Sequence, residues 1–197
     1  MSPAPSNRLF RYPSSPLTSE RLEIRQIRHE DLTDLFAVHS VDAVNRFLPY
    51  STWQNEDDAQ AWWERVQQRT SDGKAMQFVI CDVEAARVMG ACILFAYDRE
   101  HQRAELGYAI GQAYWGKGYA REAMLCFLDY AFNDIGLRRV EARVDTRNQA
   151  SIQLLLRLGF TEEGCLRQWG RDHEGCIDLQ LYGLLRHEWS QANDKTG

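Results

Sequence analysis

The sequence is poor in proline and cysteine and lacks any long apolar run. Four of its five prolines lie within residues 1–16, which predicts an irregular N-terminal arm there and leaves the rest free to form helices and strands. No apolar run approaches the roughly 18 residues that a membrane span needs. The N-terminus also lacks a signal-peptide pattern. We therefore expect a cytoplasmic protein with no membrane partner.

Cysteine and histidine are too few and too scattered for a disulfide framework or a metal centre. The five cysteines are odd in number and include no Cys-x-x-Cys pair. They fall among apolar or strand-like residues, which is typical of small buried side chains in a reducing compartment. None of the five histidines pairs with another at metal-ligand spacing, so we expect no metal site.

Positive charge is not in excess either. The net charge of −5 disfavours binding to a nucleic-acid backbone. A length of 197 residues with 44% hydrophobic side chains favours one domain with one core. We place this domain at residues 17–189 and expect a frayed tail at 190–197. The composition leaves a monomer and a homodimer equally open.

Hydrophobic periodicity divides the chain into alternating segments of two kinds. Alternation predicts strands at 21–27, 76–83, 87–98, 103–110, 138–145, 165–171 and 176–185. A period near 3.6 predicts helices at 29–40, 55–73, 119–135 and 148–160, and residues 44–50 are expected to form a short helical turn that Pro49 ends. Asn55 fits a helix N-cap, and Gly136 and Gly159 fit helix C-termini. The order β-α-α-α-β-β-β-α-β-α-β-β indicates an α/β (α+β) domain.

The stretch AYWGKGYAREA, residues 113–123, places a glycine turn before the strongest predicted helix. The first N–H groups of a helix have no partner within it and attract anions, and glycine permits close backbone approach. The turn therefore suits a phosphate, although a plain strand-to-helix connection would also use glycine. A nucleotide P-loop needs Ser or Thr after its lysine, and here Gly118 follows Lys117. A dinucleotide fingerprint needs a third glycine where Arg121 stands.

Two longer stretches carry a family resemblance. RAELGYAIGQAYWGKGYAREAM, followed by RVEARVDTRNQASIQLLLRLGFTEEG, resembles the GNAT superfamily of acetyl-CoA-dependent N-acetyltransferases. The similarity covers roughly residues 17–189 and is greatest to the branch that contains bacterial ribosomal-protein alanine N-acetyltransferases. The resemblance implies a mixed, mostly antiparallel, twisted sheet of about seven strands flanked by helices.

The resemblance also implies acetyl-CoA as co-substrate and a set of residues that bind it. Backbone N–H groups would wrap its pyrophosphate at Trp115, Gly116, Lys117, Gly118, Tyr119 and Ala120. The preceding strand would pair with the pantetheine arm at Tyr108, Ala109 and Ile110. Asn148 and Ser151 would meet the pantetheine or the thiol from the next helix. One departure is Ala113, where the family often has Gln or Arg, so one side-chain contact is expected to be lost.

By the same resemblance, Glu105 is the candidate general base and Ser151 the candidate partner of the departing thiolate. Each also has an ordinary structural role available. Glu105 could be a solvated strand residue or part of an ion pair, and Ser151 could satisfy the first turn of its helix. Asn148 could serve as an N-cap. His101 is an alternative base if the strand of Glu105 extends that far.

The acceptor is a primary amine, either a small molecule or a protein N-terminus, because the resemblance covers enzymes of both kinds. Trp62, Trp63 and Trp169 could line its pocket or simply pack. Glu56, Asp57 and Asp58 could suit a cationic substrate or compensate a helix N-terminus. Two other functions stay open, which are a non-catalytic acyl-CoA-binding sensor or interaction module and a general nucleotide-binding protein.

Overall fold

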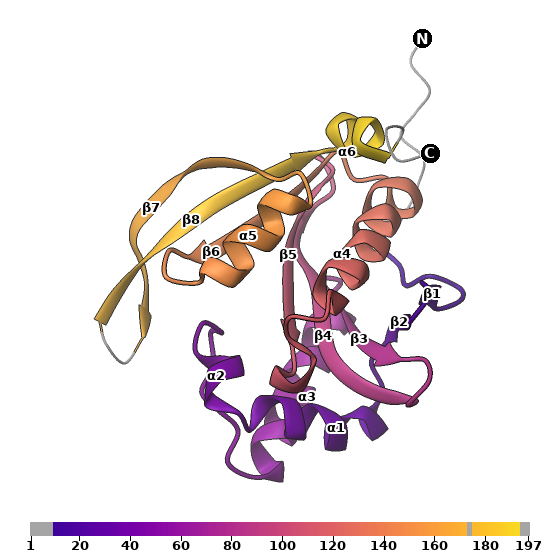
Figure 1. Cartoon of the computed structure of the whole chain (residues 1–197), viewed down its shortest axis with the longest axis vertical. Helices are drawn as coiled ribbons and strands as arrows, with labels where there is room; N and C mark the ends of the chain where they lie inside the picture. The colour runs from indigo at the N-terminus through magenta and orange to yellow at the C-terminus, as the bar shows by residue number, and fades with distance from the viewer. Residues whose placement is uncertain (1–9, 173–174, 194–197) are drawn as a thin grey trace.

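A single sheet of eight strands in the order β1-β2-β3-β4-β5-β6-β8-β7 forms the centre of the structure (Figure 1). The computed structural model describes residues 10–172 and 175–193. The strands are β1 (Leu17–Thr18), β2 (Leu22–Gln26), β3 (Ala75–Asp82), β4 (Arg87–Asp98), β5 (Arg103–Ile110), β6 (Arg139–Asp145), β7 (Thr161–Asp172) and β8 (Gly175–Leu185). The helices are α1 (Leu32–His39), α2 (Asp42–Asn45), α3 (Glu56–Ser71), α4 (Tyr119–Asp129), α5 (Gln149–Arg157) and α6 (Arg186–Asn193).

Seven of the eight strands, β2 to β8, are those that the alternation predicts, and the bounds of β4 and β5 coincide with the predicted ones. The prediction of about seven strands misses β1, which has two residues and is too short to show an alternation. Residues 10–16 of the predicted N-terminal arm carry no helix or strand, and residues 1–9 lie outside the described part of the chain.

Two of the predicted helical segments need correction. The segment predicted over 44–50 is helical only within α2, which ends at Asn45, and residues 46–50 form turns. The segment predicted as one helix over 119–135 is α-helical only to Asp129 and continues as a π-helical turn from Tyr130 to Ile135. The helix α6 ends at Asn193, within the stretch 190–197 for which a frayed tail is predicted. Residues 194–197 lie outside the described residues.

The only parallel pair in the described sheet is β5 with β6, and its pairing is brief. Arg103 to Glu105 pair with Arg139 to Glu141, and the two strands then separate. β5 continues to pair with β4 as far as Ile110, and β6 continues to pair with β8 as far as Asp145. The sheet is therefore whole at one end and forked at the other. We call this opening the β5–β6 fork.

Helices cover the two faces of the sheet unequally. On one face, α4, its π-helical continuation and α5 bury a large cluster that includes Phe78, Phe127 and Leu155, each with no exposed surface. On the other face, α1 and α3 bury a smaller cluster against β3 and β4, which includes Leu35 and Trp62. Figure 1 shows α4 and α5 on either side of the fork.

The helix ends follow the predicted signals. Asn55 caps α3 by accepting the N–H groups of Asp57 and Asp58 at 3.0 and 3.3 Å. Gly136 and Gly159 adopt φ values of 83° and 90° after their helices. The next N–H then reaches back to a helical carbonyl in each case, Leu137 to Ala131 and Phe160 to Leu155, both at 3.0 Å. This is the bond that a left-handed C-terminal residue permits.

The expectation that all five cysteines are buried is correct only in part. Cys81 and Cys92 are buried and Cys126 is half-buried, but Cys165 and Cys176 are exposed on β7 and β8. All five are free thiols. β7 is exposed along most of its length, so apolar neighbours in the sequence do not bury a cysteine there.

We predict that Phe127→Ala lowers the free energy of unfolding by about 3–5 kcal/mol. The Phe127 ring is fully buried and packs edge-on against Phe78 with a centroid distance of 5.0 Å, so its removal leaves a cavity. Urea denaturation measures the change. Val83→Ala, at a side chain that is 56% exposed, is the control and should change stability little. Equal losses in both variants would contradict the assignment of Phe127 to the core.

Candidate active site

The glycine turn, residues 115–118, leaves the N-terminus of α4 without a side-chain cap. Gly116 and Gly118 have φ values of 73° and 81°, and Gly118 is the N-cap residue. Asn55 and Asn148 cap α3 and α5, whereas no described side chain accepts a hydrogen bond at the start of α4. A Cβ atom added at Gly116 would meet no atom within 4 Å. Open space therefore lies beside unpaired N–H groups, as an anion-binding turn requires.

One edge of β5 becomes free where the fork opens. A Cβ atom on Gly90 of β4 would lie 2.3 Å from the carbonyl oxygen of Ala109, so that carbonyl points toward β4. Because successive residues point to opposite edges, the backbone groups of Tyr108 and Ile110 point toward the fork. The Ile110 carbonyl accepts the indole N–H of Trp115 at 2.7 Å. Of the three residues expected to pair with a pantetheine arm, Tyr108 and Ile110 therefore face the fork and Ala109 does not.

Ser151 and Tyr108 meet on the α4–α5 side of the fork. The Ser151 Oγ and the Tyr108 hydroxyl are 2.7 Å apart. Burial raises the pKa of Tyr108 to about 12, and the hydrogen bond with Ser151 opposes this rise. The phenol is therefore protonated at neutral pH and is able to donate. Asn148 Oδ1 accepts the N–H of Ser151 at 3.2 Å, so Asn148 acts as the N-cap of α5.

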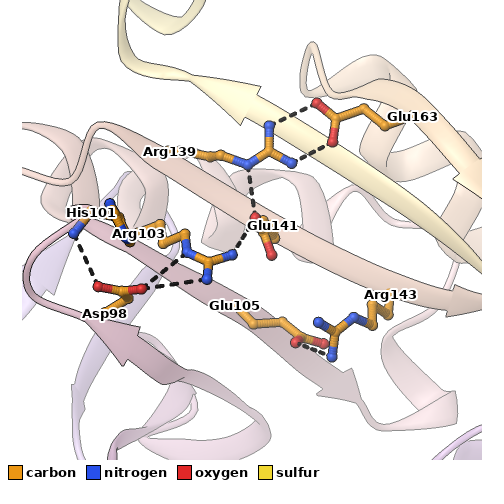
Figure 2. A network of polar contacts seen from close by, with 8 residues as sticks. All are labelled: Asp98, His101, Arg103, Glu105, Arg139, Glu141, Arg143 and Glu163. Carbon is orange, nitrogen blue, oxygen red and sulfur yellow. Dashed lines mark hydrogen bonds and ion pairs between the residues drawn. The ribbon is translucent and has the colours of Figure 1, made fainter.

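Glu105 lies on the opposite face of the sheet. Its neighbours Ala104 and Leu106 belong to the core beneath α4, so alternation directs Glu105 away from that core. The residue is 7% exposed, and its Oε2 lies 3.0 Å from Nη1 of Arg143 on β6 (Figure 2). Burial raises the pKa of Glu105, Arg143 lowers it and Glu141 raises it, with a net rise. A buried carboxylate with a raised pKa is suited to accept a proton near neutral pH.

A network of ion pairs joins the strands on this face (Figure 2). Arg103 on β5 and Arg139 on β6 both contact Glu141, at 3.4 and 2.8 Å. Arg139 also pairs with Glu163 on β7. We call this side of β5 and β6, which carries Arg103, Glu105, Arg139, Glu141 and Arg143, the charged face. Its contacts hold β5 to β6 beside the point where they part.

The comparisons with known proteins agree with this geometry. The family model of the acetyltransferase (GNAT) domain matches residues 21–161. An uncharacterized N-acetyltransferase of Bacillus licheniformis, p20, is 33% identical over 174 residues, which are 88% of this chain and 98% of that protein. The chain belongs to the GNAT acetyltransferase family. This GNAT protein is therefore an enzyme of the acyltransferase class.

Solved structures share the fold. A GCN5-related N-acetyltransferase from Brucella melitensis superposes with a TM-score of 0.81 at 23% identity, covering 89% of this chain and 80% of that chain. The spermidine N-acetyltransferase of Vibrio cholerae, solved with CoA and spermine, superposes with a TM-score of 0.77 at 22% identity. The match covers 87% of this chain and 99% of that chain. The mixed sheet predicted for this GNAT protein is thereby confirmed.

The remaining predicted residues lie apart from the fork or have other contacts. His101 sits in the exposed turn before β5, and its backbone N–H donates to Asp98 at 3.0 Å, so it does not extend the strand of Glu105. The Lys117 ammonium group donates to the Ala113 carbonyl at 2.8 Å and thereby closes the glycine turn. Asp58 takes part in the capping box of α3. This contact explains the presence of Asp58 in the first turn of α3, so a cationic substrate is not needed to explain it.

The three tryptophans proposed for an acceptor pocket separate into different environments. Trp62 is 7% exposed and belongs to the core under α1 and α3. Trp63 is half-buried and meets His29 edge-on. Trp169 is 59% exposed, and the Arg143 guanidinium lies 5.5 Å from its ring centroid. Among the three, Trp169 is the one that reaches the charged face.

Sequence reasoning missed the residue that braces the glycine turn, which is Arg21 between β1 and β2. Its Nη1 donates to the Lys117 carbonyl at 3.2 Å, and its guanidinium lies 4.3 Å from the ring centroid of Tyr119. Its Nε donates to Glu122 in the first turn of α4 at 2.7 Å, and Ser19 donates to the same carboxylate at 2.7 Å. Burial raises the pKa of Glu122, but these hydrogen bonds outweigh it and lower the pKa. No local sequence pattern signals this contact.

Two further findings concern the described residues only. Their His, Cys, Asp and Glu side chains form no group of three or more that could hold a metal ion. Within the same residues, every helix is too short or too polar to cross a membrane.

We predict that Glu105→Gln stabilises the protein, relative to the wild type, by an amount that grows as the pH rises above 4.5, the ordinary pKa of a glutamate. A carboxyl group whose pKa is raised by folding holds its proton more tightly in the folded state, so stability falls as pH rises from its ordinary value through the raised one. The variant lacks this loss. Urea denaturation at several pH values measures the difference.

Glu84→Gln, in the exposed β3–β4 turn, controls for the change in net charge. A difference between Glu105→Gln and the wild type that stays constant as the pH rises above 4.5 would contradict the raised pKa of Glu105.

Proposed function

We propose that this enzyme transfers the acetyl group of acetyl-CoA to a primary amine by direct attack, with both substrates bound at the fork. The observation that carries the proposal is the placement of two polar sites on opposite faces of the sheet, at one opening in it. Tyr108 and Ser151 lie on the α4–α5 side, and Glu105 lies on the charged face. In this proposal the thioester lies on the α4–α5 side and the amine approaches from the charged face, with the fork between them.

The residues present fit the coenzyme. The uncapped N–H groups at residues 116–120 suit its pyrophosphate, and Arg21, which is paired with Glu122, donates to the Lys117 carbonyl and braces this turn. The edge of β5 at Tyr108 and Ile110 suits the amide groups of the pantetheine arm, since an extended chain can pair with an exposed strand edge. The Vibrio cholerae neighbour contains CoA.

Acetyl-CoA supplies the thioester whose acetyl group is transferred. At neutral pH the acceptor arrives mostly as an ammonium ion, so one proton must leave before its nitrogen can attack. We assign this proton to Glu105, because its buried carboxylate has a raised pKa. As the carbon–nitrogen bond forms and the carbon–sulfur bond breaks, nitrogen loses a second proton and sulfur gains one. The net products are the amide, the CoA thiol and one proton released to solvent.

The Ser151–Tyr108 pair is our candidate donor to the departing sulfur. A hydroxyl that is hydrogen-bonded to a protonated phenol donates its proton readily, and the phenol passes it a replacement proton. The exposed and half-buried cysteines need no part in this reaction, since no covalent intermediate on the enzyme is involved.

We predict that Gly116→Ala weakens the binding of acetyl-CoA about tenfold or more, because its methyl group displaces a charge-assisted hydrogen bond to phosphate. Calorimetric titration measures the affinity, with ATP and NAD as control ligands. Gly73→Ala is a matched variant, since Gly73 has a φ of 65° and equally open surroundings. Both variants carry similar strain, and only the first should lose affinity. Equal affinities would overturn the assignment of the glycine turn to the coenzyme.

We predict that Glu105→Gln lowers kcat about 100-fold or more at pH 7, the usual contribution of a general base. The affinity of the variant for acetyl-CoA should be unchanged. Part of the rate should return at high pH, because the acceptor is then already a free amine and needs no base. Thiol release with a panel of amines measures the rate, and Glu84→Gln is the control. An unchanged pH profile would show that Glu105 is not the base. Coenzyme binding without thiol release in the wild type would favour the sensor function.

A further inference from the structure

Arg143 differs from the other arginines around the charged face in its number of partners. Arg103, Arg139 and Arg147 each contact two carboxylates. Within the described residues, Arg143 has one ion-pair partner, Glu105, through a single contact of 3.0 Å. A guanidinium has five N–H donors, and the Arg143 side chain is 33% exposed, so most of its donors remain available.

Arg143 also contacts Trp169, which lies at an irregularity in β7. The register of β7 against β8 shifts between Leu166 and Gly170. Within the shift, Gln168 has a φ of 52°, and its N–H donates to Asp178 at 2.7 Å. A bulge of this kind re-aims side chains and is common beside active sites. Here it extends an exposed indole to the guanidinium of Arg143, where a cation–π contact holds the arginine.

Arg143 occupies the place that an acceptor ammonium needs. Both cations are attracted to the one buried carboxylate of Glu105, so an acceptor that approaches Glu105 displaces or shares the contact with Arg143. An acceptor that carries only positive charge would leave two cations competing beside one carboxylate, which is unfavourable. A carboxylate on the acceptor would restore a partner to Arg143, in the bidentate geometry that guanidinium groups favour.

We infer that Arg143, held by Trp169, binds a carboxylate of the acceptor and selects amines that carry one a few atoms from the reacting nitrogen. The preferred substrate is then an amino acid or a peptide with an acidic first residue, and a polyamine is a poor substrate. The inference rests on the proposed function, because it concerns the acceptor of that reaction. It makes Arg143 a specificity-determining residue.

Pairs of acceptors that differ only in a carboxylate or carboxamide test the inference. One pair is an α-amino acid and its amide, and the other is two peptide amides that begin with aspartate and asparagine. Spermidine is the cationic acceptor. We expect the wild type to favour the carboxylate member of at least one pair about tenfold or more in kcat/KM, and to use spermidine least. A preference within the first pair indicates a free amino acid as the acceptor, and a preference within the second pair indicates a peptide.

Arg143→Gln should bring the ratio within that pair close to one, mainly through a higher KM for the carboxylate member. A change in the basicity of Glu105 acts mainly on kcat of both members, whereas lost recognition raises KM for the carboxylate member alone, so the separate kcat and KM values distinguish the two causes. Arg138→Gln removes the same charge from an exposed position just before β6 and should keep the wild-type ratio. Trp169→Leu should reduce the ratio less than Arg143→Gln does.

Three results would overturn the inference. They are equal use of both members of both pairs by the wild type, a preference of the wild type for spermidine, and a kcat/KM ratio that Arg143→Gln leaves unchanged. If acetyl-CoA binds but no amine is acetylated, the proposed function fails separately. Calorimetric binding of the same pairs to the complex with CoA then decides the inference. Tighter binding of the carboxylate member that Arg143→Gln abolishes supports it, and equal binding overturns it.

Discussion

The three-residue pairing between β5 and β6 is the constraint on which the site depends. If the pairing were longer, backbone bonds would close the edge of β5 and no ligand could pair with Tyr108 or Ile110. If it were absent, the two halves of the sheet would lose their continuity. The ion pair of Arg103 on β5 with Glu141 on β6 lies at the pairing itself, so the charged face reinforces the strands where they must stay together. The fork is thus a stable opening in an otherwise continuous sheet.

The two faces of the fork provide different chemical environments. On the α4–α5 side, Tyr108 and Ser151 form a neutral hydrogen-bonded pair at the edge of the apolar core. On the charged face, Glu105 is buried beside one arginine and a second carboxylate, Glu141. A donor for a thiolate and an acceptor for an ammonium proton are best kept apart, because a direct contact would neutralise both. The backbone of β5 lies between the two groups and keeps them apart.

The sequence predicted those parts of the structure that depend on short-range patterns. The alternation in RAELGYAI defines β5 to the residue, and the caps at Asn55, Gly136 and Gly159 mark helix ends as found. It could not predict the contacts that the fold creates between distant segments. Arg21 and Glu122 are 101 residues apart, and Tyr108 and Ser151 are 43 apart, so no local pattern relates them. The bulge that aims Trp169 also depends on pairing with β8 and leaves no mark in the alternation of β7 itself. The roles of Glu105 and Ser151 remain predictions, although their positions at the fork agree with them.

The brace formed by Arg21 joins the first two strands to the mouth of the site. Since the same guanidinium contacts the Lys117 carbonyl and the Glu122 carboxylate, opening of the glycine turn would also break contacts of the β1–β2 connection. A ligand that binds only the closed turn stabilises it by RT ln(1 + [L]/Kd), or about 2.7 kcal/mol at 100 times Kd. Amide hydrogens near Ser19 and Leu22 should then exchange more slowly when the turn is occupied, although they lie outside it. Occupancy at the head of α4 would then be communicated to the edge of the sheet through the contacts that Arg21 and Ser19 make with Glu122 and Lys117.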